Sequence, residues 1–279
     1  SPTLGLGLIG NFVGAGAQIL HFSLARNILR GAIADAGKAR MVGRSNKSRW
    51  DRPTSIKQSA KEGITMLHNT VDPAKTALLF FDMLNAYFRG SPEANQRQME
   101  PVVANCVKIR AAADAAGIPV FYAKADHRPD GLDSGHILSD TDYTLTPWPD
   151  PDHGFTTPYR TVAADDWRGE VIDELKPAPG DYVIAKHRWS AFHQTNLELS
   201  LRSRGIDTIL VCGGATHIGV ASTAYDARDL DFNQVIVRDA CSGLEDNLRQ
   251  FMERIFPIFA RVRTTEEAIG MVQAGATGQ

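Results

Sequence analysis

The fold of this chain is decided by the stretch TALLFF, residues 76–81, which the acidic residue Asp82 follows directly. The stretch is short and almost wholly apolar, a pattern typical of a β-strand that is buried on both faces. Strands of this kind occur in parallel sheets, where helices cover both faces. We therefore expect a parallel α/β domain, with Asp82 at the carboxyl end of a buried strand.

Beyond this strand, helix-like and strand-like patterns alternate. In residues 93–116, apolar side chains recur at steps of three and four, which predicts a helix that ends at Gly117. Such alternation implies right-handed crossovers and a doubly wound, Rossmann-like, mostly parallel six-stranded sheet flanked by helices. The other predicted strands are 118–123, 181–185, 207–212, 234–238 and 259–262; the other predicted helices are 195–204, 217–229, 244–256 and one capped by Thr264 and Glu267.

The first part of the chain differs in charge from the rest. Residues 1–62 contain ten Lys or Arg residues and three acidic ones, whereas the whole chain of 279 residues has a net charge of −2. This asymmetry predicts a basic, glycine-rich N-terminal extension, residues 1–70, joined to an α/β domain, residues 71–279. The extension is interpreted either as an oligomerisation or docking arm or as a targeting segment.

Composition also limits the partners and cofactors. The small net charge argues against a nucleic-acid partner, and the glycine-rich apolar run 4–20 is too short to predict membrane association. The pattern G-x-G-x-x-G at residues 5–10 lacks the preceding strand that a dinucleotide site needs, so we expect no cofactor. The three cysteines fit neither a disulfide framework nor a zinc cluster, which predicts a reducing, cytoplasmic setting.

Polar residues lie just after the predicted strands. Asp82 follows the first strand, Lys124 the second and Lys186 the third, and a glycine-rich turn at 213–219 follows the fourth. Because ligands bind beyond the carboxyl ends of the strands in such folds, we expect these residues to share one pocket. Residues 124–165 are rich in Pro, Asp and Gly, and a long loop at this edge is typical of a lid or a pocket wall.

Three segments at this edge resemble one family. FDMLNAY at 81–87 is similar to the D-M-Q-N-x-F segment of the isochorismatase-like hydrolases of the cysteine hydrolase superfamily. AKHRWSAFH at 185–193 resembles their catalytic-lysine segment. GGATHIGV at 213–220, with STAYDA at 222–227, resembles their turn and following helix. The resemblance covers about residues 75–265, and it implies a hydrolase that forms a homo-oligomer.

In that family an Asp, a Lys and a Cys form the catalytic trio, and the resemblance assigns two of these roles to Asp82 and Lys186. The third position is Gly219. True isochorismatases, which the K-x-R-W-S-A-F-H and H-I-G stretches most resemble, also have glycine there and hydrolyse an enol ether without a covalent intermediate. The chain departs from them at Ala215, where they have a substrate-reading tyrosine, and at Lys124, where they have glutamine.

The chemistry of the residues agrees with this resemblance. Glycine supplies no nucleophile, whereas protonation of an enol ether carbon needs only a positioned acid before water attacks the oxocarbenium ion. Asp82 is the candidate acid. Lys186 would lower the pKa of Asp82, whereas burial or an anionic substrate would raise it. Because their charges interact, Asp82 and Lys186 are expected to titrate as a coupled pair. The N–H groups around Gly219, at the start of a helix, are suited to an oxyanion or a carboxylate.

Further residues are candidates for substrate binding, and several have a structural alternative. Arg188 is suited to bind a carboxylate or to form an ion pair, and His217 to touch substrate or to cap a helix. The aromatic candidates Trp189 and Phe192 are suited either to line the pocket or to pack in the core. The resemblance also implies a non-proline cis peptide bond between Gly214 and Ala215. The complete substrate-binding set is Lys124, Arg188, Trp189, Phe192, Gly214, Ala215 and His217.

Metal and thiol chemistry are alternatives that the residues support less well. Asp126, His127 and His136 partly resemble the metal site of nicotinamidase relatives, but the usual Asp-x-His spacing is absent, so we expect no metal. Cys241 lies just after a strand end and is an alternative nucleophile. The other two cysteines, Cys106 and Cys212, are expected in the core.

The sequence therefore predicts a hydrolase of a small anionic substrate that cleaves the C–O bond of an enol or vinyl ether through acid catalysis by Asp82 and direct attack by water. Two other functions remain open: a C–N amidohydrolase of amides or ureides, and a catalytically inactive ligand-binding or scaffold protein. An engineered exchange of cysteine for glycine would also explain Gly219. The expected assembly is a dimer or tetramer that uses the N-terminal arm, without nucleic acid or membrane.

Overall fold

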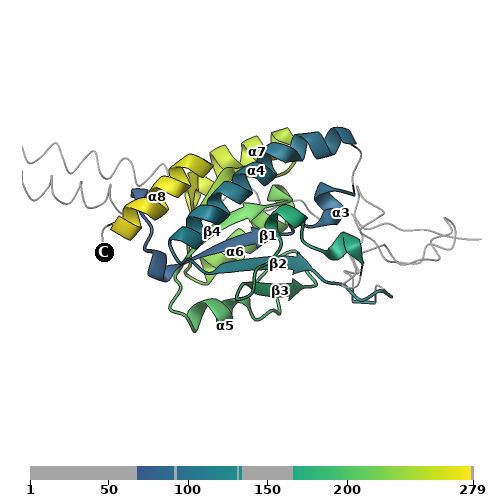
Figure 1. The fold of residues 1–279 in the computed structure, drawn as a ribbon, viewed down its shortest axis with the longest axis horizontal. Coiled ribbons are helices and arrows are strands. Elements are labelled where there is room, and N and C mark those ends of the chain that lie inside the picture. Colours follow the sequence, from purple (N-terminus) through teal and green to yellow (C-terminus); the bar gives the residue numbers. More distant parts are fainter. Residues whose placement is uncertain (1–67, 91–92, 131, 134–165, 278–279) are drawn as a thin grey trace, which may run out of the picture. The chain divides into compact units, whose positions relative to one another are not determined.

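The computed structural model describes residues 68–90, 93–130, 132–133 and 166–277 (Figure 1). The predicted N-terminal extension, residues 1–70, lies almost entirely outside these ranges, so its boundary, its role as an arm and the homo-oligomer remain predictions. Residues 134–165 of the predicted long loop also lie outside them. Among the described residues, no helix has both the length and the apolar character needed to cross a membrane.

Six parallel strands form one sheet in the order β3-β2-β1-β4-β5-β6, which confirms the predicted doubly wound sheet (Figure 1). From β1, the chain extends the sheet in one direction through β2 and β3 and in the other through β4, β5 and β6, so β1 and β4 flank a topological switch point. The strands are β1 (Thr76–Phe81), β2 (Val120–Ala125), β3 (Tyr182–Lys186), β4 (Thr208–Gly213), β5 (Asn233–Cys241) and β6 (Arg261–Arg263).

The strand β1 has the predicted bounds, and its apolar pattern reflects burial on both faces. All six of its residues are buried. Leu78 and Phe80 belong to the core on one side of the sheet, while Leu79 and Phe81 belong to the core on the other. The one polar side chain, Thr76, donates its hydroxyl to the carbonyl of Asp72 at 2.7 Å, so its burial leaves no unsatisfied donor.

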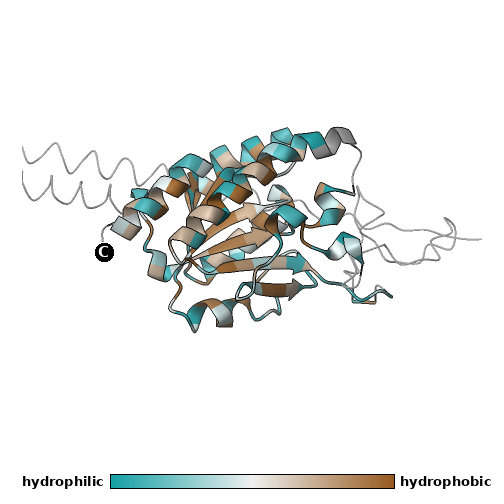
Figure 2. Ribbon diagram, viewed as in Figure 1, coloured by the Kyte–Doolittle hydropathy of each residue, from teal (hydrophilic) through white to brown (hydrophobic). Residues whose placement is uncertain are grey.

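Helices cover both faces of the sheet. The helices α4 (Glu93–Ala115) and α8 (Thr265–Thr277) pack on one face, and α5 (Leu197–Arg202) and α6 (Ala221–Asp229) pack on the other. Figure 2 shows the hydrophobic residues concentrated in the sheet between these layers. The shorter elements are α3 (Asn85–Phe88), α7 (Glu245–Gln250), the π turns Thr216–Val220 and Phe251–Ile255, and the 3-10 turns Pro73–Lys75, Trp167–Gly169, Asp173–Leu175 and Phe256–Ile258.

The second strand begins later than residue 118, because Ile118 belongs to the end of the preceding helix. Gly117 has a φ of +68°, the left-handed conformation that ends many helices, which confirms its predicted role. The N–H of Ile118 donates to the carbonyl of Ala113 at 2.9 Å and closes the last turn. The strand therefore starts at Val120, once the helix has been capped.

Two predicted helices are divided in the structure. The helix expected over 217–229 begins as a π turn before α6, and the one expected over 244–256 consists of α7, a π turn and a 3-10 turn. Pro257 explains the second case, since proline lacks an N–H and disfavours helical backbone at the residue before it. The strand β5 also runs beyond the predicted residue 238, after a register shift between Val211 and Gly213 of β4.

The last helix, α8, starts with the predicted capping box. The N–H of Glu267 donates to Oγ1 of Thr264 at 3.2 Å, and the N–H of Thr264 donates to Oε2 of Glu267 at 2.8 Å. The carboxylate of Asp239 accepts the N–H of Thr265 at 2.7 Å, which ties the start of α8 to β5. These bonds satisfy backbone donors that would otherwise lack partners at the helix start.

We expect Glu267→Ala to lower the free energy of unfolding by about 0.5–1 kcal/mol more than Glu266→Ala does. Both residues are exposed in the first turn of α8 and both interact with the helix dipole, but Glu267 also accepts the N–H of Thr264. Urea unfolding of the two variants measures the difference. An equal loss in both variants would contradict a stabilising role for the capping box.

Candidate active site

The candidate residues gather at the carboxyl edge of the sheet, next to the switch point between β1 and β4. Asp82 follows β1, Lys186 ends β3, and Gly219 lies in the π turn after β4. The strand β2 lies between β1 and β3, and its last residue, Ala125, pairs with Lys186. The side chains of Asp82 and Lys186 therefore meet over the end of β2.

Asp82 and Lys186 form a buried ion pair. The Nζ of Lys186 lies 2.7 Å from Oδ2 of Asp82, and Oδ1 accepts the N–H of Ala125 at 2.8 Å. Only 6% of Asp82 and 4% of Lys186 is exposed. Asp82 has a φ of +47°, which few residues other than Gly, Asn and Asp adopt. Groups from β2 and β3 thus hold both carboxylate oxygens in a defined direction.

Burial and ion pairing act in opposite directions on the Asp82 carboxyl group. Removal from water is the larger effect and raises the pKa of Asp82 above its ordinary value. The Lys186 ammonium group and the N–H of Ala125 partly offset this rise. Both effects were expected from the sequence, and the structure shows that burial outweighs the cation. The Asp82 carboxyl therefore retains a proton to higher pH than an exposed carboxyl does.

The ring of Phe81 lies between Lys186 and Gly219. Only 1% of Phe81 is exposed, and the Nζ of Lys186 lies 4.4 Å from its ring centroid, a cation–π contact. The edge of the same ring faces the backbone of Gly219. Sequence analysis missed this role. The available signal was an aromatic residue at the last position of a buried strand, directly before Asp82.

The turn after β4 contains the cis peptide bond between Gly214 and Ala215 that the resemblance implies. Gly213 has a φ of +117°, and a Cβ there would lie 2.1 Å from the carbonyl oxygen of Phe81, so the close approach of the two strands requires glycine. Thr216 anchors the turn to the end of β5, since its N–H and its hydroxyl both donate to the carbonyl of Ser242 at 2.8 Å.

The N–H groups around Gly219 are less available than the sequence suggested. In the π turn, the N–H groups of Ile218 and Val220 donate to the carbonyl of Ala215 at 3.2 and 3.3 Å. Two of the donors expected to face an oxyanion or a carboxylate are therefore engaged within the turn itself. Such π turns interrupt regular helices and occur frequently at functional sites.

Thr223 of α6 connects Gly219 to the segment after Lys186. Its hydroxyl donates to the carbonyl of Gly219 at 2.8 Å and accepts the N–H of Ala191 at 3.0 Å. Thr223 is fully buried, so this bridge satisfies three polar groups that water does not reach. The residue stood in the family-like segment, but sequence analysis gave it no role.

The two aromatic candidates lie in different surroundings. Phe192 is 9% exposed and its ring centroid lies 5.6 Å from that of Phe232, so it packs in the core, as its structural alternative predicted. Trp189 is 49% exposed. The side chain of Trp189 lies at the surface near the end of β3. The positions of Phe192 and Trp189 do not by themselves assign either side chain a contact with substrate.

The polar candidates also have defined contacts. Lys124 pairs with Asp126 at 3.4 Å. Within the described residues Arg188 bonds backbone: its Nη1 donates to the carbonyls of Asp133 at 2.8 Å and His187 at 2.6 Å. The Nδ1 of His217 is buried and has no hydrogen-bond partner among the described residues, so it remains available to a ligand or to water.

All three cysteines are free and buried, which was expected for Cys106 and Cys212 but not for Cys241, the last residue of β5. Cys241, the alternative nucleophile, is 2% exposed, and its Sγ lies 3.8 Å from the carbonyl oxygen of Val211. Burial raises the pKa of the Cys241 thiol far above its ordinary value. Because the thiolate is the reactive form, a buried thiol of this kind is a poor nucleophile.

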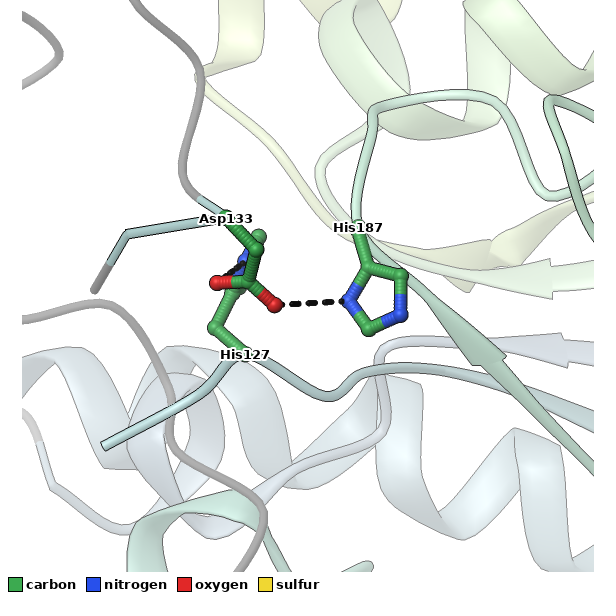
Figure 3. Close-up of side chains that lie close together, drawn as sticks. All are labelled: His127, Asp133 and His187. Atoms are coloured by element: carbon green, nitrogen blue, oxygen red, sulfur yellow. Dashed lines mark hydrogen bonds and ion pairs between the residues drawn. The ribbon is translucent and has the colours of Figure 1, made fainter. Parts of the chain in front are cut away.

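Of the residues considered for a metal, Asp126 pairs with Lys124, and His136 lies outside the described residues, so the predicted set is not tested as a whole. His127 instead lies beside Asp133, which has His187 on its other side (Figure 3). Sequence analysis considered His127 for a metal but not Asp133 or His187, because His187 follows a different strand and the spacing of His127 and Asp133 matches no metal motif.

Comparison with known proteins identifies the family. A model of the isochorismatase domain matches residues 76–267. YwoC, an uncharacterised isochorismatase family protein of Bacillus subtilis (strain 168), is 45% identical over 109 residues, which cover 39% of this chain and 57% of that protein. YecD, an uncharacterised isochorismatase family protein of Escherichia coli O157:H7, is 34% identical over 197 residues, or 70% of this chain and 94% of that protein.

An enzyme and a solved structure extend this comparison. The ureidoacrylate amidohydrolase RutB of Methylobacterium radiotolerans is 29% identical over 218 residues, which cover 75% of this chain and 84% of that protein. The structure of an isochorismatase family protein from Burkholderia thailandensis has a TM-score of 0.61 and 29% identity, and the match covers 74% of this chain and 98% of that chain. The chain therefore belongs to the isochorismatase family of hydrolases.

Proposed function

We propose that this protein hydrolyses the C–O bond of a small anionic enol or vinyl ether, with Asp82 as the acid and water as the direct nucleophile. Family membership supports hydrolysis, whereas the choice of bond rests on the site. One observation carries this choice. Glycine occupies position 219, where the family resemblance places a thiol, and the ring of Phe81 fills the space beside it.

A cysteine side chain at position 219 would have no room. A Cβ on Gly219 would lie 2.2 Å from Cε1 and 2.3 Å from Cζ of Phe81, well inside van der Waals contact. The ring is packed in the core, so moving it aside would disturb its neighbours. Shape as well as sequence thus argues against a covalent thiol intermediate and favours attack by water.

In the proposed reaction, the protonated Asp82 carboxyl donates its proton to the vinyl carbon, and the C=C electron pair forms the new C–H bond. A water molecule then adds to the oxocarbenium ion, and its proton returns to the Asp82 carboxylate. The hemiketal transfers its hydroxyl proton to the leaving oxygen and separates into a ketone and an alcohol. The raised pKa of Asp82 supports the first step, because the acid keeps its proton to higher pH.

Lys186 supports both the proton transfer and the choice of an anionic substrate. Its Nζ lies 2.7 Å from the carboxylate that Asp82 becomes after it gives up the proton. A buried carboxylate without a cation would cost several kcal/mol, so the ammonium group makes the ionised state accessible. The same positive charge attracts an anion to the carboxyl edge of the sheet.

Hydrolysis of a C–N bond is the second candidate, because the chain is 29% identical to a ureidoacrylate amidohydrolase. In this chain such a reaction would also have to proceed without a thiol at position 219. Amide and ureide substrates therefore belong in the same test as enol ethers, and the class of compound that is turned over distinguishes the two candidates.

We expect Asp82→Asn to lower kcat for an enol ether substrate by about 100- to 10,000-fold, the usual contribution of a general acid. Asparagine has nearly the same shape and can still accept the N–H of Ala125, but it leaves the buried Lys186 without its anion, so the melting temperature of the variant is measured beside its kcat to establish that it folds. The measurement is a turnover screen of anionic enol ethers, amides and ureides with the parent chain and the variant.

The matched control is Asp207→Asn, at the opposite end of the sheet beside Thr208, and it should leave kcat within about twofold of the parent value. Turnover of amides or ureides alone would favour the C–N candidate. Inactivation by iodoacetamide with labelling of Cys241 would overturn direct attack by water. Binding of anions without any turnover would favour the ligand-binding alternative.

The proposed acid also has a signature in the pH dependence. Because the reaction needs the protonated carboxyl, we expect kcat/KM to fall as the pH rises through the raised pKa of Asp82. Lys186→Met removes the cation that opposes this rise, so the falling limb should move to higher pH although the maximal rate decreases. Lys75→Met, an exposed lysine at the other end of β1, should leave the midpoint unchanged. A shift to lower pH in Lys186→Met would contradict the assignment.

The contact between Phe81 and Gly219 predicts a cost for restoring a cysteine. We expect Gly219→Cys and Gly219→Ala each to lower the free energy of unfolding by about 1–3 kcal/mol, because the Cβ alone meets the ring. Combination with Phe81→Leu should be less damaging than the sum of the single changes, as a double-mutant cycle measures. Gly270→Ala, where a Cβ meets nothing within 4 Å, is the control. A Gly219→Cys variant as stable as the parent chain would refute the steric argument.

A further inference from the structure

We propose that His127, Asp133 and His187 form a binding site for a divalent transition-metal ion such as Zn²⁺. His127 comes from the segment after β2, His187 directly follows β3, and Asp133 comes from the loop beyond His127. One ligand atom of each residue lies within 4.8 Å of the others. Its three side chains are not those of the proposed reaction, although the imidazole of His127 lies near enough to the Asp82–Lys186 pair to interact with it electrostatically.

The aspartate lies between the two imidazole rings, as Figure 3 shows. The Nδ1 of His127 lies 3.3 Å from Oδ1 of Asp133, and the Nδ1 of His187 lies 3.2 Å from Oδ2. Ligand atoms bound to one tetrahedral zinc ion are about 3.3 Å apart, given bonds of roughly 2.0–2.1 Å. The two short contacts run to different oxygens of the Asp133 carboxylate, so an ion between the side chains would take the place of these imidazole–carboxylate contacts. The three ligand atoms already lie within 4.8 Å of one another, and the side chain of His187 is exposed.

The backbone around the three side chains is held in place. The Nη1 of Arg188 donates to the carbonyls of both Asp133 and His187, which links the loop to the end of β3. The N–H of Arg128 donates to both carboxylate oxygens of Asp133 at 3.1 Å. Such hydrogen bonds orient a carboxylate ligand and leave lone pairs for an ion.

The Asp133 carboxylate pairs with the two histidines. Asp133 is 22% exposed and His127 is 14% exposed, so solvent only partly screens their interaction. Three cations of these loops pair with other carboxylates: Arg128 with Asp130, Lys124 with Asp126 and Lys186 with Asp82. The fourth, Arg188, bonds the carbonyl of Asp133, so among the described residues the ion pairs of the Asp133 carboxylate are those with His127 and His187.

The chemistry of the three side chains indicates which ion the site would take. Imidazole nitrogens and a carboxylate oxygen are ordinary ligands of transition-metal ions. Two imidazoles and one carboxylate favour zinc, cobalt or iron over magnesium or calcium, and they leave coordination positions open.

The test is a titration of the tag-free, metal-stripped chain with Co²⁺, followed by displacement with Zn²⁺. Visible absorption reports the Co²⁺ coordination, and elemental analysis reports the metal bound per chain. We expect one ion per chain, and we expect His187→Ala and Asp133→Ala each to weaken Co²⁺ binding by at least about tenfold. His193→Ala removes an exposed histidine of the same segment and should bind as the parent chain does.

Absence of Co²⁺ binding by the parent chain, or unchanged affinity in both ligand variants, would overturn the proposal. Melting temperatures without metal establish that the variants fold, and His127→Ala replaces either variant that does not. The metal site and the proposed hydrolysis can fail independently, because Asp82→Asn keeps all three metal ligands and should still bind one Co²⁺ per chain. Metal binding by Asp82→Asn without catalysis would support both assignments.

Discussion

The local structure depends on the ion pair between Asp82 and Lys186, which are both almost completely buried. Either charge alone would be costly at this depth, and removal of one partner from such a pair typically costs about 3–5 kcal/mol. The pair forms because β1 and β3 flank β2 in a parallel sheet, which brings residues from distant segments to one edge. The left-handed backbone of Asp82 and the N–H of Ala125 then direct the carboxylate toward the lysine.

The ring of Phe81 connects the ion pair to the turn after β4. It lies under the Lys186 ammonium group and against Gly219, so the pair and the turn after β4 share one packed side chain. Glycine at position 219 therefore has two consequences. It leaves space for the ring of Phe81, and it leaves the position without a nucleophile. We propose attack by water because the acid Asp82 and the cation Lys186 lie near position 219, where a thiol has no room.

The carboxyl edge carries two polar groups of different character. The Asp82–Lys186 pair is almost completely buried, whereas the cluster of His127, Asp133 and His187 is partly exposed to solvent. Both arise from the same geometry, since the ends of neighbouring parallel strands place their following residues side by side. The hydrogen bond from Asp126 to Lys186, at 3.2 Å between backbone N and O, continues the pairing of β2 and β3 into the segments that carry the histidines.

The sequence by itself determined the doubly wound sheet, the bounds of β1, the capping box of α8 and the resemblance to the isochorismatase-like hydrolases. These features depend on local patterns or on contiguous motifs, which can be read without coordinates. The tertiary structure alone decided that burial outweighs Lys186 in setting the pKa of Asp82, that Phe81 fills the space beside Gly219, and that Asp133 lies between two histidines. Each of these outcomes depends on distances between residues far apart in the chain, and no sequence periodicity encodes such distances.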